Sequence, residues 1–338
     1  MLMLNPSKFL FLMMLILGTL ISISSNSWPA TWIGLEINLL AFIPLMSSKD
    51  SMMSTEASMK YFIVQAMASS MLLTLTISNF MFTFITSELM NSIIATTLLI
   101  KMGAAPFHMW FPSVMEGLSW MNCLILMTWQ KLAPFVILSY LNFNHQIMIF
   151  VMLFSVIIGS IGGLNQTSTR KIMAYSSINH IGWMILALTM SENLWQIYYM
   201  IYTVLSSAVI MIFHNMSSQH VNQLSLNWLP SISKFVMLIS LLSLGGLPPF
   251  LGFLPKWLVI QSSIYSQMWF TITAMILITL MTLFYYLRLA MTSFLMSSTQ
   301  PNWNQKLSNK FIMSKSTSML SMISMTTLPL YTVLFYGS

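Results

Sequence analysis

The chain is a succession of long apolar runs separated by short polar joints. A helix needs about 20 apolar residues to cross the hydrocarbon core of a bilayer. Eleven runs of this kind span residues 8–25, 28–46, 57–79, 88–110, 120–140, 146–164, 170–190, 195–217, 234–266, 268–295 and 317–337. Only 6% of the residues are Asp, Glu, Lys or Arg, which is too few to cover these runs with a charged, water-facing surface. The sequence therefore predicts an all-α polytopic membrane protein with about 11 transmembrane helices in a single domain, residues 1–338.

When successive runs are placed across a membrane in alternating directions, the basic residues of the joints fall on one side of the membrane. On the side of the N-terminus, the joints and span ends carry the basic residues Lys8, Lys49, Lys60, Arg170, Lys171, Lys234, Arg288, Lys306, Lys310 and Lys315. The joints on the other side carry Glu88 and Glu192 and no Lys or Arg. The positive-inside rule then places the N-terminus in the cytoplasm or, in an organelle, in the matrix. The net charge of +7 is a topology signal, and its basic residues are too scattered to predict a nucleic-acid partner.

Several kinds of chemistry are excluded by what the sequence lacks. The single cysteine, Cys123, cannot form an intramolecular disulfide, a CxxC redox site or a multi-cysteine zinc site. Gly159, Gly162 and Gly163 lack the Lys-Ser/Thr of a phosphate-binding loop and favour close contact between helices. There is no metal-ligand cluster, catalytic triad, haem ligand pair or nucleotide motif. We therefore expect no metal or cofactor on this chain and any redox chemistry on another one.

Four charged residues fall inside the predicted spans: Glu36, Lys101, Lys131 and Lys256. An ionised group at the bilayer centre costs at least ~2.5–3.5 kcal/mol, and more where nothing solvates it. Lys101 and Lys256 could extend toward an interface, or Glu36 could form a static pair with one lysine. A static pair would leave two further lysines unexplained. We therefore interpret the four residues as a functional row.

Proton handling is the chemistry that such a row supports. Burial favours a neutral lysine, whereas a nearby carboxylate favours the charged form, so a lysine between these influences gains or loses a proton when a neighbouring charge moves. Polar residues that could support water between these groups are Asn38, Thr96, Thr97, Gln130 and His180. His180 fits a packed, hydrogen-bonded histidine better than a relay member, and His108 is a candidate exit group near the N-terminal side.

Helix-breaking motifs stand beside two of the lysines. Lys101 precedes and Lys256 follows a Gly-x-x-Pro-Phe motif, at Gly103–Phe107 and Gly246–Phe250, 143 positions apart. Proline frees a backbone carbonyl, and in lipid such a break must line protein or water. Matching interruptions in two halves of a transporter point to the ion pathway.

An offset of 143 positions covers five helices, an odd number, so the repeat predicts two inverted units. They cover approximately residues 8–140 and 146–295, and a C-terminal helix follows at 317–337. The lysines do not coincide at this offset, and a pair of proline kinks used for packing is the alternative.

Five stretches of the sequence carry a family resemblance. They are Trp32-Ile-Gly-Leu-Glu-Ile-Asn-Leu-Leu, Lys101-Met-Gly-Ala-Ala-Pro-Phe-His-Met-Trp, Trp129-Gln-Lys-Leu-Ala-Pro, Thr169-Arg-Lys-Ile-Met-Ala-Tyr-Ser-Ser-Ile-Asn-His-Ile-Gly-Trp and Gly246-Leu-Pro-Pro-Phe-Leu-Gly-Phe-Leu-Pro-Lys-Trp. In this order they resemble the subunit 2 family of animal mitochondrial NADH:ubiquinone oxidoreductase, respiratory complex I. The resemblance covers essentially the whole chain.

This resemblance implies an antiporter-like fold and a role in proton translocation coupled to quinone reduction elsewhere in the complex. It gives Glu36 the role of the first half-channel glutamate, Lys101 that of its partner, Lys131 that of the central lysine and Lys256 that of the broken-helix lysine. It implies no cofactor on this chain, whereas NADH, FMN, iron–sulfur clusters and ubiquinone are expected in the assembled complex.

The resemblance also implies a location and partners. The chain is expected in the mitochondrial inner membrane, with its N-terminus in the matrix and its C-terminus in the intermembrane space. Its partners would be membrane lipid and other complex I subunits, including neighbouring antiporter-like ones. A free-standing cation/proton antiporter and an inert scaffold that only packs its neighbours remain as alternatives.

Overall fold

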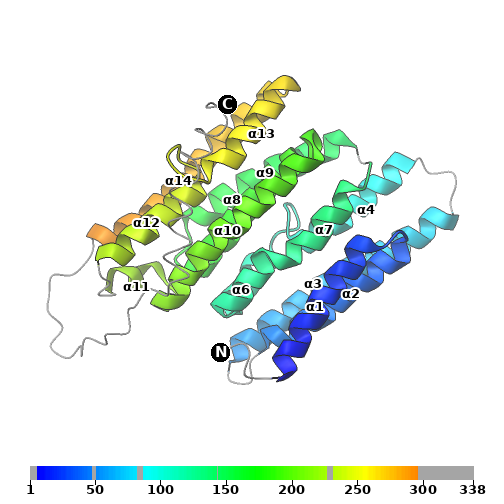
Figure 1. Ribbon diagram of the computed structural model, residues 1–338, viewed down its shortest axis with the longest axis horizontal. Coiled ribbons are helices and arrows are strands. Elements are labelled where there is room, and N and C mark those ends of the chain that lie inside the picture. Colours follow the sequence, from blue (N-terminus) through cyan, green and yellow to red (C-terminus); the bar gives the residue numbers. More distant parts are fainter. Residues whose placement is uncertain (1–5, 48–50, 82–86, 143, 227–230, 296–338) are drawn as a thin grey trace, which may run out of the picture. The chain divides into compact units, whose positions relative to one another are not determined.

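The computed structural model describes residues 6–47, 51–81, 87–142, 144–226 and 231–295 (Figure 1). The helices are α1 (Pro6–Ser24), α2 (Trp28–Met46), α3 (Met52–Met81), α4 (Ser87–Met102), α5 (Trp110–Gly117), α6 (Trp120–Met127), α7 (Trp129–Ser139), α8 (His145–Leu164), α9 (Thr169–Met190), α10 (Glu192–Met216), α11 (Val221–Leu226), α12 (Ser231–Gly245), α13 (Phe253–Tyr265) and α14 (Trp269–Leu295). Within these ranges the β structure is one isolated bridge, between Ser168 and His220. The all-α prediction is confirmed.

Ten of the eleven predicted runs coincide with helices or with pairs of consecutive helices. The eleventh run, 317–337, lies outside the described residues, as do Lys49, Lys306, Lys310 and Lys315. Seven helical stretches in the described ranges are long and apolar enough to cross a membrane. They are α1, α2, α3, the consecutive α6 and α7, α8, α10 and α14. The other runs form helices that are shorter, interrupted or more polar.

Helix α9 is more polar because it lies inside the protein. Every residue from 176 to 188 is buried, on all faces of the helix. A helix surrounded by other helices needs no continuous apolar surface toward lipid, so it can carry Ser176, Ser177, Asn179 and His180. Peripheral helices show the opposite pattern, since Phe9, Leu10, Leu17 and Leu20 of α1 are all exposed. Large apolar side chains on an outer surface suit a lipid environment.

The structure divides into two compact units, residues 1–155 and 156–338. In the first unit, α3 packs against α2, α4 and α5, and α7 packs against α1, α4 and α6 (Figure 1). In the second unit, α9 and α10 pack against each other and against α13, and α14 packs against α9, α12 and α13.

Close packing at the end of α8 depends on its glycines and on one arginine. A Cβ atom at Gly159 would lie 2.6 Å from the backbone nitrogen of Asn179, and one at Gly163 would lie 2.8 Å from the ring of Tyr285. The prediction that these glycines permit close helix contact is confirmed. The guanidinium of Arg288 donates to the carbonyls of Leu164 and Gln166, at 2.5 and 3.0 Å. It therefore ties α14 to the carbonyl end of α8.

Candidate functional site

Both Gly-x-x-Pro-Phe motifs break a helix, and they do so in the same way. Gly103 and Gly246 have positive φ values of 75° and 80°, which L-residues with a side chain rarely adopt. The next backbone nitrogen reaches back to the last turn, from Ala104 to the Leu99 carbonyl at 3.0 Å and from Leu247 to the Leu242 carbonyl at 3.4 Å. This is the Schellman pattern of a helix C-terminus. The predicted breaks are confirmed.

The internal repeat reaches beyond the motif itself. Helix α4 ends at Met102 and α12 at Gly245, and α5 begins at Trp110 and α13 at Phe253. Each pair of positions is 143 residues apart, the offset that separates the two motifs in the sequence. The backbone break, with its glycine and its restart, is therefore repeated as a unit.

The two breaks differ in how their free carbonyls are satisfied. At the end of α4, the Trp110 indole donates to the carbonyl of Ile100 at 3.2 Å, and the Gln65 amide donates to that of Lys101 at 3.1 Å. At the end of α12, the Lys256 ammonium donates to the carbonyl of Gly245 at 2.8 Å. The partial negative charge at a helix C-terminus favours a cation at that place. Neutral donors fill this role in the first unit, and a lysine fills it in the second.

Glu36 and Lys101 are charged neighbours in the first unit. Lys101 is 7% exposed, and Glu36, on α2, is half-buried. The Glu36 charge acts through space on the Lys101 ammonium and on the Tyr61 hydroxyl of α3. The carboxylate and the lysine that the resemblance pairs thus lie within electrostatic range of each other, and their pairing stays a prediction.

A small polar cavity lies beside Lys101. Its volume is about 20 Å³, and its lining residues are Leu35, Asn38, Leu39, Tyr61, Gln65, Lys101, Gln130 and Pro134. This is room for one water molecule, which needs two to four polar partners. The lining supplies amides, a hydroxyl and the lysine itself. Asn38 and Gln130, predicted to support water, both line it, whereas Thr96 and Thr97 hydrogen-bond to carbonyls of their own helix.

The two predicted amides are bonded to each other across this cavity. The Gln130 Nε2 group donates to Asn38 Oδ1 at 3.0 Å, and the Tyr61 hydroxyl donates to Gln130 Oε1 at 3.3 Å. These bonds join α2, α3 and α7. Tyr61 also contacts the rings of Phe42 and Trp110, with centroids 5.4 and 5.9 Å away, which fixes its position.

Lys131 lies deeper than the other predicted residues and does not line the cavity. It is 1% exposed, and its ammonium lies 5.0 Å from the centre of the Phe111 ring on α5. A desolvated cation–π contact contributes about 2 kcal/mol, which offsets part of the cost of burying the charge. A third interruption precedes this lysine at Thr128, whose hydroxyl bonds the carbonyl of Leu124, four residues back, at 2.7 Å.

Lys256 lies in the second unit, on α13. It is 7% exposed, and its ammonium lies 5.9 Å from the centre of the Trp183 ring on α9. A Cβ atom at Gly246 would lie 3.0 Å from both Cδ and Nζ of this lysine. The glycine therefore supplies the turn and also the space in which Lys256 lies against the end of α12.

The two histidines are both buried. His180 Nδ1 lies 2.9 Å from the Tyr198 hydroxyl of α10, and its ring packs on Tyr202 with centroids 5.0 Å apart. This is the packed, hydrogen-bonded arrangement that the sequence favours. His108 lies between α4 and α5, with Nδ1 3.1 Å from the Pro106 carbonyl. Its proposed part in proton exit stays a prediction.

Sequence reasoning missed Tyr61, Gln65, Phe111 and Trp183. Tyr61 and Gln65 are four positions apart on one helix and therefore share a face. Two polar side chains on one face of an apolar span are a pattern that the sequence does show. Phe111 and Trp183 could not be found in this way, because the sequence of an apolar span does not show which side chain packs against an aromatic ring.

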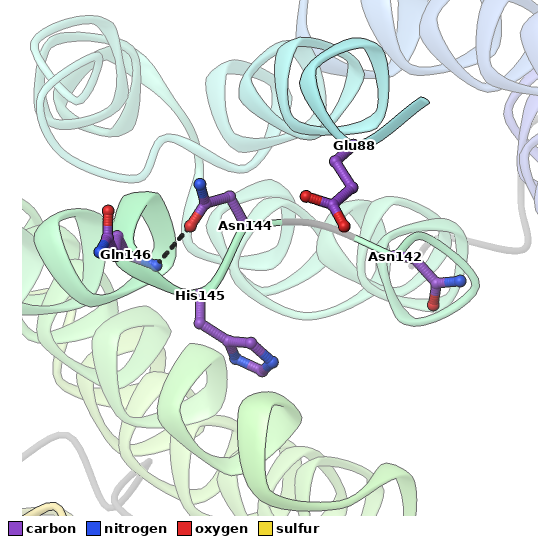
Figure 2. Close-up of a pocket in the computed structure, with 5 residues that line it drawn as sticks. All are labelled: Glu88, Asn142, Asn144, His145 and Gln146. Carbon is purple, nitrogen blue, oxygen red and sulfur yellow. Dashed lines mark hydrogen bonds between the residues drawn. The ribbon is translucent and has the colours of Figure 1, made fainter. Parts of the chain in front are cut away.

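An open cavity of about 300 Å³ lies where α4 begins and α7 passes into α8 (Figure 2). Its lining residues are Glu88, Asn142, Asn144, His145 and Gln146. Asn144 Oδ1 accepts from the backbone nitrogen of Gln146 at 2.9 Å and so caps α8. In Figure 2 the His145 ring points away from the Glu88 carboxylate. In the described ranges, no group of three or more His, Cys, Asp or Glu side chains could hold a metal ion.

Comparison with known proteins places this geometry in a family. The family model described as "NADH:quinone oxidoreductase/Mrp antiporter, TM" matches residues 25–282, most of the chain. The chain belongs to this family. Membership in the NADH:quinone oxidoreductase/Mrp antiporter family confirms the resemblance read from the five motifs.

Named relatives of this family are similar over most of their length. The chain is 51% identical to "NADH-ubiquinone oxidoreductase chain 2" of Anopheles gambiae over 89% of each chain. It is 45% identical to the protein of that name from Locusta migratoria, covering 95% of this chain and 94% of the relative. With the Latimeria chalumnae protein of that name the identity is 40%, with 93% and 94% covered.

Solved structures share the fold. A chain of respiratory complex I from Thermus thermophilus matches 96% of this chain and 80% of its own length, with a TM-score of 0.82 and 22% identity. A chain of the Mrp complex from Dietzia matches 86% of this chain and 61% of its own length, with a TM-score of 0.77 and 17% identity. These matches confirm the antiporter-like fold.

Proposed function

We propose that this chain is the antiporter-like subunit 2 of mitochondrial NADH:ubiquinone oxidoreductase. In this role it translocates protons through its buried charges, coupled to quinone reduction elsewhere in the complex. The observation that carries the proposal is that each of three buried lysines lies in the helix turn next to a break. Lys101 is in the last turn of α4 before Gly103, Lys131 is in the first turn of α7 after Thr128, and Lys256 is in the first turn of α13, where the helix resumes after Gly246. An interruption supplies polar backbone inside the membrane, which a moving charge needs.

The proposed roles follow the environment of each group. Glu36 is the charge that modulates Lys101, and Lys101 lies beside a cavity with room for water. Lys131 takes the central relay position over Phe111. Lys256 binds a proton where the end of α12 favours the ammonium and releases it when that contact opens. NADH, FMN, iron–sulfur clusters and ubiquinone would belong to the partner subunits.

The location follows from the same assignment. We propose the mitochondrial inner membrane with the N-terminus in the matrix, as the distribution of basic joints predicts. The two halves would be inverted five-helix units, in keeping with the repeated break. The partners would be neighbouring subunits of the complex and membrane lipid.

The test uses the assembled complex reconstituted in liposomes. Lys131→Met or Glu36→Gln should lower the number of protons pumped per NADH, because each removes a group that carries or modulates the charge. Proton uptake and NADH oxidation are measured together. An unchanged proton ratio at unchanged turnover would remove the role assigned to that residue.

A free-standing cation/proton antiporter is the second candidate, because the Mrp complex shares the fold. The names of the 40–51% identical relatives favour the complex I assignment. A native gel separates the two, since only the complex I assignment requires the chain to migrate with a very large NADH-oxidising assembly. Neutral replacement of all four buried charges without loss of pumping would instead indicate an inert scaffold.

A further inference from the structure

One tryptophan of α2 carries a buried hydrogen-bond donor that binds no other described group. The indole nitrogen of Trp32, Nε1, has almost no exposed surface and no hydrogen-bond partner in the part of the chain that the structure describes. An indole N–H can only donate, and a donor that is buried without a partner costs free energy. Few such groups occur in native proteins, and each one calls for an acceptor that can reach it.

A matching acceptor lies one turn further along the same helix. Glu36 follows Trp32 by four positions in α2, and residues at this spacing share a face, with Cβ atoms about 5–6 Å apart. Side chains in a helix lean toward its N-terminus, so Glu36 leans toward the turn that contains Trp32. Both residues are half-buried. An ionised carboxylate only accepts hydrogen bonds, so the two groups are complementary.

The Glu36 carboxylate is not held by any other donor. Within the described ranges it has no hydrogen bond or ion pair, although its charge acts on the Lys101 ammonium. The Tyr61 hydroxyl also lies within range of this charge, but it donates to Gln130. The attraction of Lys101 depends on whether this lysine is protonated, whereas the indole N–H is a donor in either case.

We propose that Trp32 is a positioning residue for Glu36, whose carboxylate accepts a hydrogen bond from the indole N–H when Lys101 is neutral. Glu36 then has two defined positions. A charged Lys101 draws the carboxylate away from α2, and a neutral Lys101 leaves it to Trp32. The inference rests on the proposed function, in which Glu36 modulates Lys101, and it adds the group that holds Glu36 in its second position.

A structure of the assembled complex carrying Lys101→Met tests the contact directly. Methionine is unbranched and uncharged, so it removes the attraction of the ammonium while keeping an extended side chain. We expect an electron cryo-microscopy map of this complex to place a Glu36 carboxylate oxygen within about 3.2 Å of Trp32 Nε1. Adding Trp32→Phe to Lys101→Met should remove the carboxylate from that place. A Glu36 side chain that stays away from Trp32 in the Lys101→Met map overturns the proposal.

Proton pumping shows whether this contact affects Glu36 in function. Trp32→Phe keeps an aromatic ring and removes the N–H, so protons per NADH in liposomes should fall toward the value for Glu36→Gln. Trp28→Phe is the matched control, because it makes the same change in α2 about 12 Å from Glu36 along the helix axis, and it should pump normally. Adding Trp32→Phe to Glu36→Gln should cause no further loss, whereas a general structural defect would add its own.

The results separate this inference from the proposed function. Normal pumping in Trp32→Phe together with lost pumping in Glu36→Gln rejects the role of Trp32 and leaves the proposed function in place. An equal loss in Trp28→Phe and Trp32→Phe also rejects that role. Normal pumping in Glu36→Gln removes Glu36 from the proposed function, while the Lys101→Met map still decides the contact. The same map decides it if Trp32→Phe does not assemble.

Discussion

Gly246→Ala is the substitution whose effect can be worked out most fully from the structure. The glycine has a φ of 80°, and a left-handed conformation costs an L-residue roughly 1–2 kcal/mol. The new methyl group would also lie 3.0 Å from the Lys256 ammonium, which must move. Movement threatens its 2.8 Å bond to Gly245, and a hydrogen bond to a charged group contributes about 1.5–3 kcal/mol. The loss is therefore about 1–2 kcal/mol from the backbone alone, and it rises to about 2.5–5 kcal/mol where the hydrogen bond is lost as well.

Neighbouring variants separate these two effects. Gly245→Ala places its methyl 3.6 Å or more from its neighbours in a helical residue, so it should be neutral or stabilising by up to about 1 kcal/mol. Gly246→Asn retains the contact with Lys256 but lowers the backbone strain, because Asn tolerates positive φ. Its thermal stability should recover in part while its pumping defect persists.

The assay follows the assembled complex through two readouts. Heat inactivation of NADH oxidation reports stability, and protons per NADH in liposomes report the position of Lys256. We expect Gly246→Ala to inactivate at lower temperature and to pump fewer protons, and Gly245→Ala to match the unaltered complex in both. If the two alanine variants behaved alike, the reasoning about the turn and the lysine would be refuted.

Three further substitutions test other contacts. Arg288→Leu leaves two carbonyls near the end of α8 without the guanidinium that donates to them, and each such bond contributes about 1.5–3 kcal/mol. The amount of assembled complex on a native gel should therefore fall. Arg288→Lys should restore part of it. Gly159→Val should prevent assembly, because its side chain meets the backbone of α9, which cannot move aside. Tyr198→Phe removes the hydroxyl that lies 2.9 Å from His180 Nδ1, and it should cost about 1 kcal/mol in heat stability with pumping unchanged. A lowered proton ratio in Tyr198→Phe would instead make this histidine a relay member.

The sequence predicted the elements that hydrophobicity and helix breakers control. Apolar runs marked ten helical spans of the described ranges, because a lipid-facing helix must be apolar over its whole length. Gly103 and Gly246 marked both breaks, because a positive φ and a following proline leave a clear pattern. The buried charges stood out against apolar neighbours for the same reason.

The sequence could not show what surrounds those charges. The interruption at Thr128 has no glycine or proline, and it depends on a hydroxyl bonding back to Leu124, which many threonines in helices do without ending them. The contact between Lys131 and Phe111 joins α7 to α5, and neither segment's sequence indicates that it packs against the other. Such pairings follow from tertiary packing alone.

The two halves of the chain share the position of the helix break but not the position of the lysine. At the offset of 143, Leu244 stands where Lys101 would recur and Ser113 where Lys256 would, yet the helix ends and restarts coincide. The common chemical element is therefore a set of carbonyls that have lost their helical donors. Any nearby donor can satisfy them, whether it precedes the break or follows it, and the second unit uses an ammonium where the first uses an indole and an amide. Lys256, which follows its break, bonds such a carbonyl directly, whereas Lys101, which precedes its break, lies within electrostatic range of Glu36. The two halves can therefore carry buried charge at positions that do not superpose.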